Sequence, residues 1–336
     1  MIRCRGTLVV LSIIVGMSIP GRAGDALLDS ALYCLGTQDY AHAEKLISRI
    51  LADNPSNIDA LYFRVAIEQS RILDYESYTI DQKSFAVLTD SVENQLERRL
   101  HTLTGRDSLR CLFYLGNISG GESLIMAKCG YWFGAVKQAM LSINSLNRVV
   151  KCAPSMYEAY LGIGIFNYYL SVNFRWMPLI GNQIEEGIEN IRTATRAPFP
   201  YDLAAKNSFC WVIMDKGNYR AADSIATAVL AELPDNTIFL RIRAYALARQ
   251  GRFGESLTTS QRLVDVSKAR KPVNWSDVMT GYHSMIECLD AMGDSRQLLA
   301  LADEATRMFV PRPYDKLPYV TESRNAICQL RKKYRK

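Results

Sequence analysis

The chain of 336 residues is poor in the motifs that mark most enzyme sites. It has three histidines, His42, His101 and His283, which lie far apart in the sequence and belong to no H-E-x-x-H or Cys/His cluster. No G-x-x-x-x-G-K-[ST] loop is present to cradle a phosphate. Residues 116–121 read GNISGG, which lacks the G-x-S-x-G spacing of a nucleophile turn and argues against Ser119 as a nucleophile. We therefore predict a protein that is not an enzyme and that has no catalytic residue, metal ligand or cofactor.

Paired cysteines and long apolar runs are also scarce. The eight cysteines are scattered without any C-x-x-C spacing, so neither a zinc site nor a disulfide scaffold is indicated. A composition of 49% hydrophobic and 22% charged residues excludes a disordered or collagen-like chain. Only one apolar run approaches the length of a membrane span, which excludes a polytopic membrane protein. What remains is a mostly helical globular protein.

The first 23 residues have the pattern of a secretory signal peptide. Two arginines, Arg3 and Arg5, precede the apolar run 7–20, and small residues follow it at 21–24. We expect cleavage after Ala23 and hence an exported protein of the periplasm or cell envelope. The alternative is an uncleaved membrane anchor, although 14 apolar residues are fewer than the roughly 20 that span a bilayer.

The positive charge of the chain is concentrated at its ends. The formal net charge is +6, and residues 1–23 contribute three arginines and no acid. The last six residues carry five cations and no acid. The net positive charge therefore comes from the two ends of the chain and does not indicate a nucleic-acid-binding surface. We expect a solvated tail, with weak contact to anionic lipid or an acidic partner as the alternative. The five cations are Arg331, Lys332, Lys333, Arg335 and Lys336.

A repeat with a period of 34 residues runs along the chain. Residues 216–230 align with 250–264, so that Gly217 matches Gly251 and Ala222 matches Ser256. The distance of 12 residues from a small residue to a proline recurs from Ala43 to Pro55 and from Ala222 to Pro234. Small residues let two helices approach closely, a glycine ends the first helix, and the proline stops the second. The pattern therefore predicts stacked helical hairpins.

These features resemble the tetratricopeptide repeat. The resemblance implies an all-α, right-handed superhelical solenoid with an irregular aromatic-rich middle and a C-terminal capping helix. It is strongest over 24–57 and over 203–312, which holds three copies. Residues 58–200 read as degenerate or modified repeats with an inserted loop near 171–184, and 313–336 as the capping helix and basic tail. Residues 271–278 insert eight residues before the last copy.

The middle segment 157–187 is unusually aromatic. Its pattern G-x-G-x-F-N-x-x-L-S, followed by a proline-containing loop and G-x(5)-G, is similar to the Iml2/TTC39 group of repeat proteins. That resemblance again implies a helical-repeat protein. We expect the aromatic residues to pack a loop against the solenoid, with an aromatic-lined ligand pocket or a membrane-interface patch as alternatives. The residues concerned are Phe166, Tyr168, Tyr169, Phe174 and Trp176.

The repeat resemblance also implies a concave groove lined by the first helix of each hairpin. Arginine, tyrosine and tryptophan on such a face are suited to bind an extended peptide with an acidic end. An ordinary solvated helix face is the alternative. The groove residues are Asn207, Trp211 and Asp215 in one copy, Arg241, Tyr245 and Arg249 in the next, and His283, Glu287 and Asp290 in the last.

Three functions remain open from the sequence. The first is an exported scaffold or assembly factor that binds a protein or peptide in the groove. The second is an enzyme or small-ligand binder that uses the aromatic segment. The third is a membrane-associated structural protein held by its N-terminus or basic tail.

Overall fold

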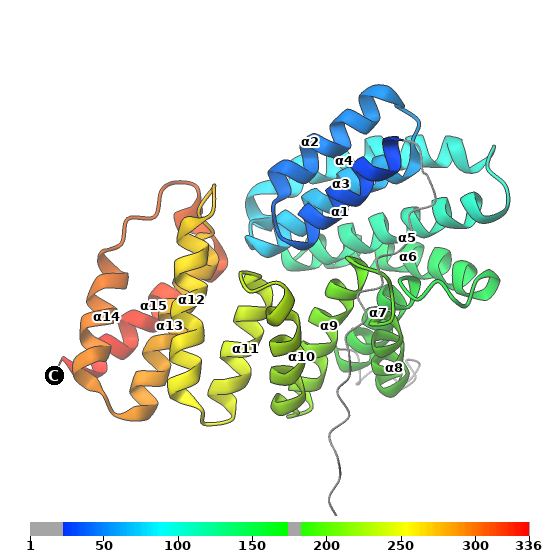
Figure 1. Ribbon diagram of the computed structural model, residues 1–336. Helices are drawn as coiled ribbons and strands as arrows, with labels where there is room; N and C mark the ends of the chain where they lie inside the picture. The colour runs from blue at the N-terminus through cyan, green and yellow to red at the C-terminus, as the bar shows by residue number, and fades with distance from the viewer. Residues whose placement is uncertain (1–22, 174–182, 336) are drawn as a thin grey trace, which may run out of the picture.

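The computed structural model describes residues 23–173 and 183–335, so the expected signal segment lies almost entirely outside the described residues. Within them, the secondary structure is fifteen α-helices and one short 3-10 helix, with no strand, which confirms the all-α prediction (Figure 1). No helix in this part of the chain has the length and apolar character needed to cross a membrane.

Fourteen of the helices form seven consecutive antiparallel hairpins, and the last helix packs on the seventh hairpin. The helices are α1 (Ala23–Gly36), α2 (Tyr40–Asp53), α3 (Ile58–Asp74), α4 (Tyr78–Leu100), α5 (Gly105–Lys128), α6 (Trp132–Cys152), α7 (Ala159–Asn173), α8 (Ile184–Ala194), α9 (Tyr201–Asp215), α10 (Tyr219–Glu232), α11 (Thr237–Arg249), α12 (Phe253–Ala269), α13 (Trp275–Met292), α14 (Ser295–Arg307) and α15 (Pro318–Tyr334).

Small residues sit where the two helices of a hairpin approach each other. Ala43, Ala222 and Ser256 are each the fourth residue of the second helix of their hairpin, and all three are fully buried. Asparagine or aspartate caps several helix starts, as Asn236 does by accepting a hydrogen bond from the Phe239 N–H at 3.3 Å. The periodic spacing of small residues and caps thus explains why the chain folds into repeated hairpins.

The turn inside every hairpin except α7–α8, whose turn lies outside the described residues, contains a residue with a left-handed backbone. Gly217 and Gly251 have φ values of 80° and 75°, which a residue without a side chain adopts at little cost. In the first two hairpins, however, the same place is taken by Gln38 at 65° and Glu76 at 51°. Left-handed conformations of such residues are strained, and strain of this kind is concentrated at functional or tightly constrained positions.

The superhelix is curved enough for its two ends to meet. Figure 1 shows α1–α4 lying against the loops that precede α11 and follow α12. Hydrogen bonds join the chain near residues 36–76 to the chain near 236–277, about 200 residues away. The hollow side of the solenoid is therefore partly filled by the chain itself, whereas the repeat pattern had predicted an open groove.

Candidate functional site

The predicted groove residues lie on α9, α11 and α13, the first helices of three consecutive hairpins. Helix α11 packs against both α9 and α13, so the three helices form one continuous face. The structure divides this face into two parts. One part is sealed by the N-terminal hairpins, and the other is exposed.

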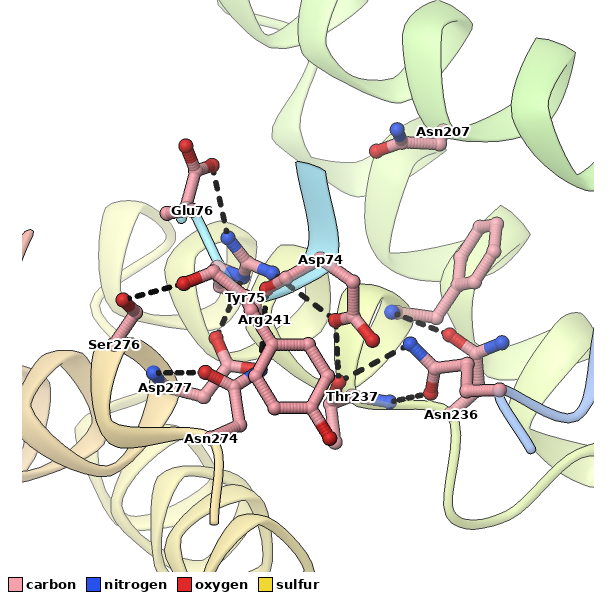
Figure 2. Close-up of polar contacts among 12 residues, drawn as sticks. Asp74, Tyr75, Glu76, Asn207, Asn236, Thr237, Arg241, Asn274, Ser276 and Asp277 are labelled. Carbon is pink, nitrogen blue, oxygen red and sulfur yellow. Dashed lines mark hydrogen bonds and ion pairs between the residues drawn. The ribbon is translucent and has the colours of Figure 1, made fainter. Parts of the chain in front are cut away.

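Arg241 lies in the sealed part (Figure 2). Its side chain is 16% exposed, and its Nε is 3.1 Å from Oδ1 of Asp277. Its Nη1 is 3.6 Å from Oε1 of Glu76, at the end of the second hairpin turn. The charge of Arg241 is thus neutralised within the chain, which removes it from the peptide-binding role expected from the sequence.

A second arginine, Arg270, joins the same two regions of the chain. Arg270 Nη1 donates to Oδ2 of the fully buried Asp74 at 2.7 Å. Its guanidinium lies over the rings of Tyr75 and Tyr40, at 4.7 and 5.6 Å from their centroids. This arginine therefore pairs with a carboxylate and with two aromatic faces at once.

Neutral hydrogen bonds extend the contact on both sides. Asn274 Nδ2 donates to the Asp74 carbonyl at 3.1 Å, and Ser276 Oγ donates to the Tyr75 carbonyl at 2.8 Å. At the other side, the Thr237 N–H donates to Gln38 Oε1 at 2.9 Å. We call this whole contact the seam. It comprises Gln38, Asp74, Tyr75, Glu76, Asn236, Thr237, Arg241, Arg270, Asn274, Ser276 and Asp277.

The three carboxylates of the seam are balanced by its two arginines together with Lys128, which lies beside it. Burial raises the pKa of Asp277, and the nearby guanidinium of Arg241 opposes that rise. Burial by itself would lower the pKa of Arg241, but Asp277, Glu76 and Asp74 reverse this effect and raise it. Glu76 also accepts from Lys128 Nζ at 2.9 Å. Removing Arg241 would leave Asp277 without its cationic partner, and removing Arg270 would leave Asp74 without its closest one.

The exposed part of the face carries a row of aromatic rings. The ring centroid of Tyr245 lies 5.8 Å from that of Trp211 and 6.4 Å from that of Tyr219. Arg249 lies over the Tyr219 ring at 5.3 Å, and its Nη2 donates to the Tyr219 hydroxyl at 3.2 Å. Trp211 Nε1 donates to Asn207 Oδ1 at 3.1 Å. We call these five residues the aromatic stripe.

Four of these residues, Asn207, Trp211, Tyr245 and Arg249, were predicted to line the groove, and Tyr219 was not among the predicted groove residues. The structure brings all five together. Tyr245 is 42% exposed, and the Arg249 side chain is also exposed. Among the described residues, Arg249 makes no ion pair with a carboxylate, so its charge is available to a partner. The stripe therefore offers apolar rings and one cation on the same surface.

The remaining groove residues lie around this stripe. Asp215 accepts a hydrogen bond from the Tyr168 hydroxyl at 3.2 Å. On α13, His283 Nε2 lies 3.4 Å from Glu287 Oε1. Asp290 accepts from Lys333 Nζ at 2.7 Å. These contacts are formed within the chain and leave Glu287 exposed at the far end of the face.

The basic tail is largely paired in the structure. Arg331 and Arg335 both contact Asp303, the latter at 2.7 Å, while Lys333 contacts Asp290. Lys332 is exposed, and Lys336 lies outside the described residues. The expectation of a solvated tail is therefore corrected for Arg331 alone, whose side chain is 25% exposed beside Asp303, whereas Lys333 and Arg335 stay 57% and 49% exposed in their ion pairs.

The aromatic middle segment is only partly described. Tyr168 is buried, and burial raises the pKa of its hydroxyl to about 12. Tyr169 is 46% exposed and packs edge-on against Tyr168, with ring centroids 5.3 Å apart. Phe166 is half-buried, whereas Phe174 and Trp176 lie outside the described residues. Whether these residues form a ligand pocket stays a prediction.

A cavity of about 740 Å³ lies beside the seam and not beside the aromatic segment. Helices α2 and α3 line one side of it, and the segment from Val266 to Pro272 lines the other. Its lining includes Arg64, Glu68, Arg71 and Lys271, which mix both signs of charge. Such a lining does not identify one class of ligand.

Two groups of side chains bring metal-ligating atoms within 4.8 Å of one another. The first is Cys34, Asp39 and His42, and the second is Asp90, Glu93 and Glu122. In the second group, Thr89 and Gln138 already donate hydrogen bonds to Glu122. Neither group lies on the aromatic stripe, and the prediction of no metal ligand stays untested.

Sequence reasoning missed the seam. Its only sequence signal was the eight-residue insertion 271–278, which supplies Asn274, Ser276 and Asp277. A repeat pattern describes contacts between neighbouring hairpins. It does not describe contacts between hairpins that the superhelix brings together after several repeats.

Comparison with known proteins shows similarity in fold alone. No family model and no curated protein matches the chain. Among solved structures, a Rap protein complexed with Competence and Sporulation Factor has a TM-score of 0.50 at 11% identity, covering 91% of this chain and 85% of its own. A tetratricopeptide repeat protein from Parabacteroides merdae has a TM-score of 0.41 at 14% identity, covering 92% and 100%. PilW, a type IV pilus biogenesis factor, has a TM-score of 0.40 at 12% identity, covering 90% and 98%.

The chain has a tetratricopeptide-repeat-like helical solenoid fold, as the sequence predicted. The narrower resemblance to the Iml2/TTC39 group stays a prediction.

Proposed function

We propose that this protein is an exported, non-enzymatic scaffold that binds an extended segment of a partner protein along the aromatic stripe. The observation that carries the proposal is the position of Tyr245. Its half-exposed ring lies between Trp211 and Tyr219, with the Arg249 guanidinium at the edge of the same surface.

The chemistry of the stripe defines the partner segment. Tyrosine, tryptophan and arginine contribute most of the binding energy at protein interfaces, because they combine a large apolar area with polar groups at the tip. The ring packing holds Tyr245 in place before binding, so less side-chain entropy is lost. We expect the segment to present an apolar or aromatic side chain to Tyr245 and a carboxylate to Arg249.

The seam supports this role by fixing the stripe. Arg241 and Tyr245 are four residues apart on α11, so they lie one turn from each other. Because Arg241 is anchored to Asp277 and Glu76, helix α11 is held against both ends of the solenoid. A rigid helix presents its exposed residues in a defined geometry.

The test is site-specific photo-crosslinking in the native envelope fraction. A photoreactive phenylalanine analogue at position 245 should give one defined crosslinked partner, identified by mass spectrometry. The same analogue at Phe309, which is 81% exposed in the loop after α14, is the control and should not give that product. Identical products from both positions would contradict the assignment of the stripe.

Binding to the purified partner provides the quantitative test. We expect the variant Tyr245→Ala with Arg249→Ala to weaken binding by about 100-fold, which corresponds to two interface hot spots of about 1–2 kcal/mol each. The matched control is Phe309→Ala with Arg312→Ala, which also removes one exposed aromatic ring and one exposed guanidinium. Equal affinity of both variants would refute the proposal.

The export part of the proposal rests on the sequence of residues 1–23. The mass of the protein recovered from cells tests it. A protein that begins at Gly24 supports cleavage and export, and a protein that retains the apolar run supports an anchor.

A further inference from the structure

Helix α6 exposes a continuous apolar surface at its N-terminal end. Phe133 is 97% exposed, and Trp132 and Tyr131 are 64% and 57% exposed. One and two turns later, Val136 and Met140 are 50% and 48% exposed. Few soluble surfaces leave this many large apolar side chains in contact with water, and such patches mark interaction sites.

These side chains lie on one side of the helix. Phe133, Val136 and Met140 follow one another at spacings of three and four residues, which places them on a common face. Leu141, 47% exposed, flanks the same face. The face points away from α5 and α7, the helices on which α6 packs through Ser142, Leu146 and Val149. It is therefore separate from the aromatic stripe of α9–α11.

The charge on this helix is all of one sign. Lys137, Arg148 and Lys151 are exposed, and none of them has an ion pair among the described residues. No aspartate or glutamate occurs between residues 123 and 157. Lys137 lies one turn after Phe133, and Arg148 and Lys151 continue the same face toward the C-terminal end of α6. The surface is thus apolar at one end and basic along its length.

The start of the helix is also unprotected. Tyr131 at the N-cap makes no side-chain cap hydrogen bond, and the first turn has no acidic residue. The partial positive charge of the helix dipole is consequently not offset at the point where the three aromatic residues project. Phosphate groups of a lipid surface would interact favourably with it.

We propose that the exposed face of α6 docks onto an anionic lipid bilayer. Aromatic side chains favour the interface between headgroups and acyl chains, and lysine and arginine beside them attract anionic headgroups. A second copy of the chain is a poorer occupant, because a symmetric α6–α6 contact would bring basic helices together without any acidic counterpart. The solenoid would lie on the membrane through α6 while the aromatic stripe stays available to a protein.

Vesicle co-sedimentation tests this proposal. The protein used is the full-length product purified from its host cells, with whatever N-terminus it has there. The wild-type protein should sediment with vesicles of phosphatidylcholine and phosphatidylglycerol and much less with phosphatidylcholine alone. Replacing Trp132 and Phe133 together with Ser should lower the partition coefficient by about tenfold or more. Phe309→Ser is the matched control for an exposed aromatic residue and should change it less than about twofold.

Charge reversal gives an independent variant that leaves the apolar residues in place. Lys137→Glu with Arg148→Glu should also reduce binding to anionic vesicles, and added salt should reduce binding of the wild type. Circular dichroism confirms that each variant remains helical. Sedimentation velocity, run in parallel, reports the oligomeric state.

Three results would overturn the proposal. The wild type could stay in the supernatant with anionic vesicles, or the Trp132/Phe133 variant could bind them as well as the Phe309 control. In the third case, the Trp132/Phe133 substitutions would turn a dimer into a monomer without changing vesicle binding, which would assign the face to a second copy of the chain.

Discussion

At the scale of single residues, the seam depends on two side chains in strained positions. Gln38 and Glu76 take the left-handed place that glycine occupies in later hairpins. Gln38 accepts from the Thr237 N–H, and Glu76 faces Arg241 and Lys128. A glycine would relax the backbone at either position but would remove these contacts. The strain is thus tied to side-chain contacts of the seam.

Glu93 provides a prediction about pH at the residue scale. Burial raises the pKa of Glu93 to about 7, and the charges of Glu122, Glu97 and Asp90 add to this rise. A hydrogen bond from Ser119 Oγ, at 3.3 Å, acts in the opposite direction. An unfolded glutamate has a pKa near 4.3, so the folded protein binds this proton more tightly. The resulting stabilisation is complete below about pH 4 and is lost as the pH rises through 7.

Glu93→Gln should therefore stabilise the protein at pH 8 relative to the wild type and have little effect at pH 4.5. We expect a difference of about 1–2 kcal/mol in the free energy of unfolding at pH 8. Urea unfolding at the two pH values measures it. Glu232→Gln, which removes an exposed carboxylate at the end of α10 away from Glu93, is the control and should not show this pH dependence. A Glu93→Gln effect that is the same at both pH values would contradict the assignment.

At the scale of helices, two glycines of the sixth hairpin should respond in opposite ways. Gly251 has a φ of 75°, whereas Gly254 lies in the first turn of α12 with open space around its Cα. Gly251→Ala should cost about 1 kcal/mol because alanine is strained in the left-handed region. Gly254→Ala should stabilise by about 0.5–1 kcal/mol because alanine favours a helix. Thermal unfolding of both variants checks these signs, and a stabilising Gly251→Ala would be inconsistent with the turn.

The α7–α8 hairpin rests on contact between two glycines. A Cβ on Gly164 would lie 2.7 Å from the Gly187 carbonyl oxygen and 2.7 Å from the Ile191 nitrogen, so backbone atoms would have to move. Gly164→Ala should cost about 2–3 kcal/mol in urea unfolding. Gly162→Ala meets the end of the Leu146 side chain, which can shift, and should cost less. Equal costs would show that α7 and α8 do not approach this closely.

The helices also show how far sequence alone could go. Period, small residues and turn glycines predicted the all-α solenoid, because each of these features acts between neighbouring helices. The left-handed positions of Gln38 and Glu76 were not predictable, because neither residue favours that conformation. The exposed face of α6 was missed for a related reason. An apolar residue at helical spacing is predicted to be buried, because the sequence does not show whether another helix packs against it.

At the scale of the whole molecule, the seam changes the meaning of the predicted groove. Trp211, Tyr245 and Arg249 lie together on the first helices of two neighbouring hairpins, and their role in binding remains a proposal. Arg241, on the same helix face, was expected to bind a partner but instead binds Asp277 and Glu76. Arg241 is buried because the solenoid curves over five successive hairpins. This curvature brings the turns of the first two hairpins into contact with α11 and α13. Such long-range closure depends on small rotations per repeat, which residue patterns do not encode.

The most direct test of this closure is a double-mutant cycle between Asp74 and Arg270, which are 196 residues apart and 2.7 Å from each other. Asp74→Asn and Arg270→Gln should each cost about 3 kcal/mol or more in the free energy of unfolding, because each leaves a buried charge without its partner. The double variant should cost less than the sum, with a coupling energy of about 2 kcal/mol or more. Costs that add to within about 0.5 kcal/mol would contradict a closed solenoid.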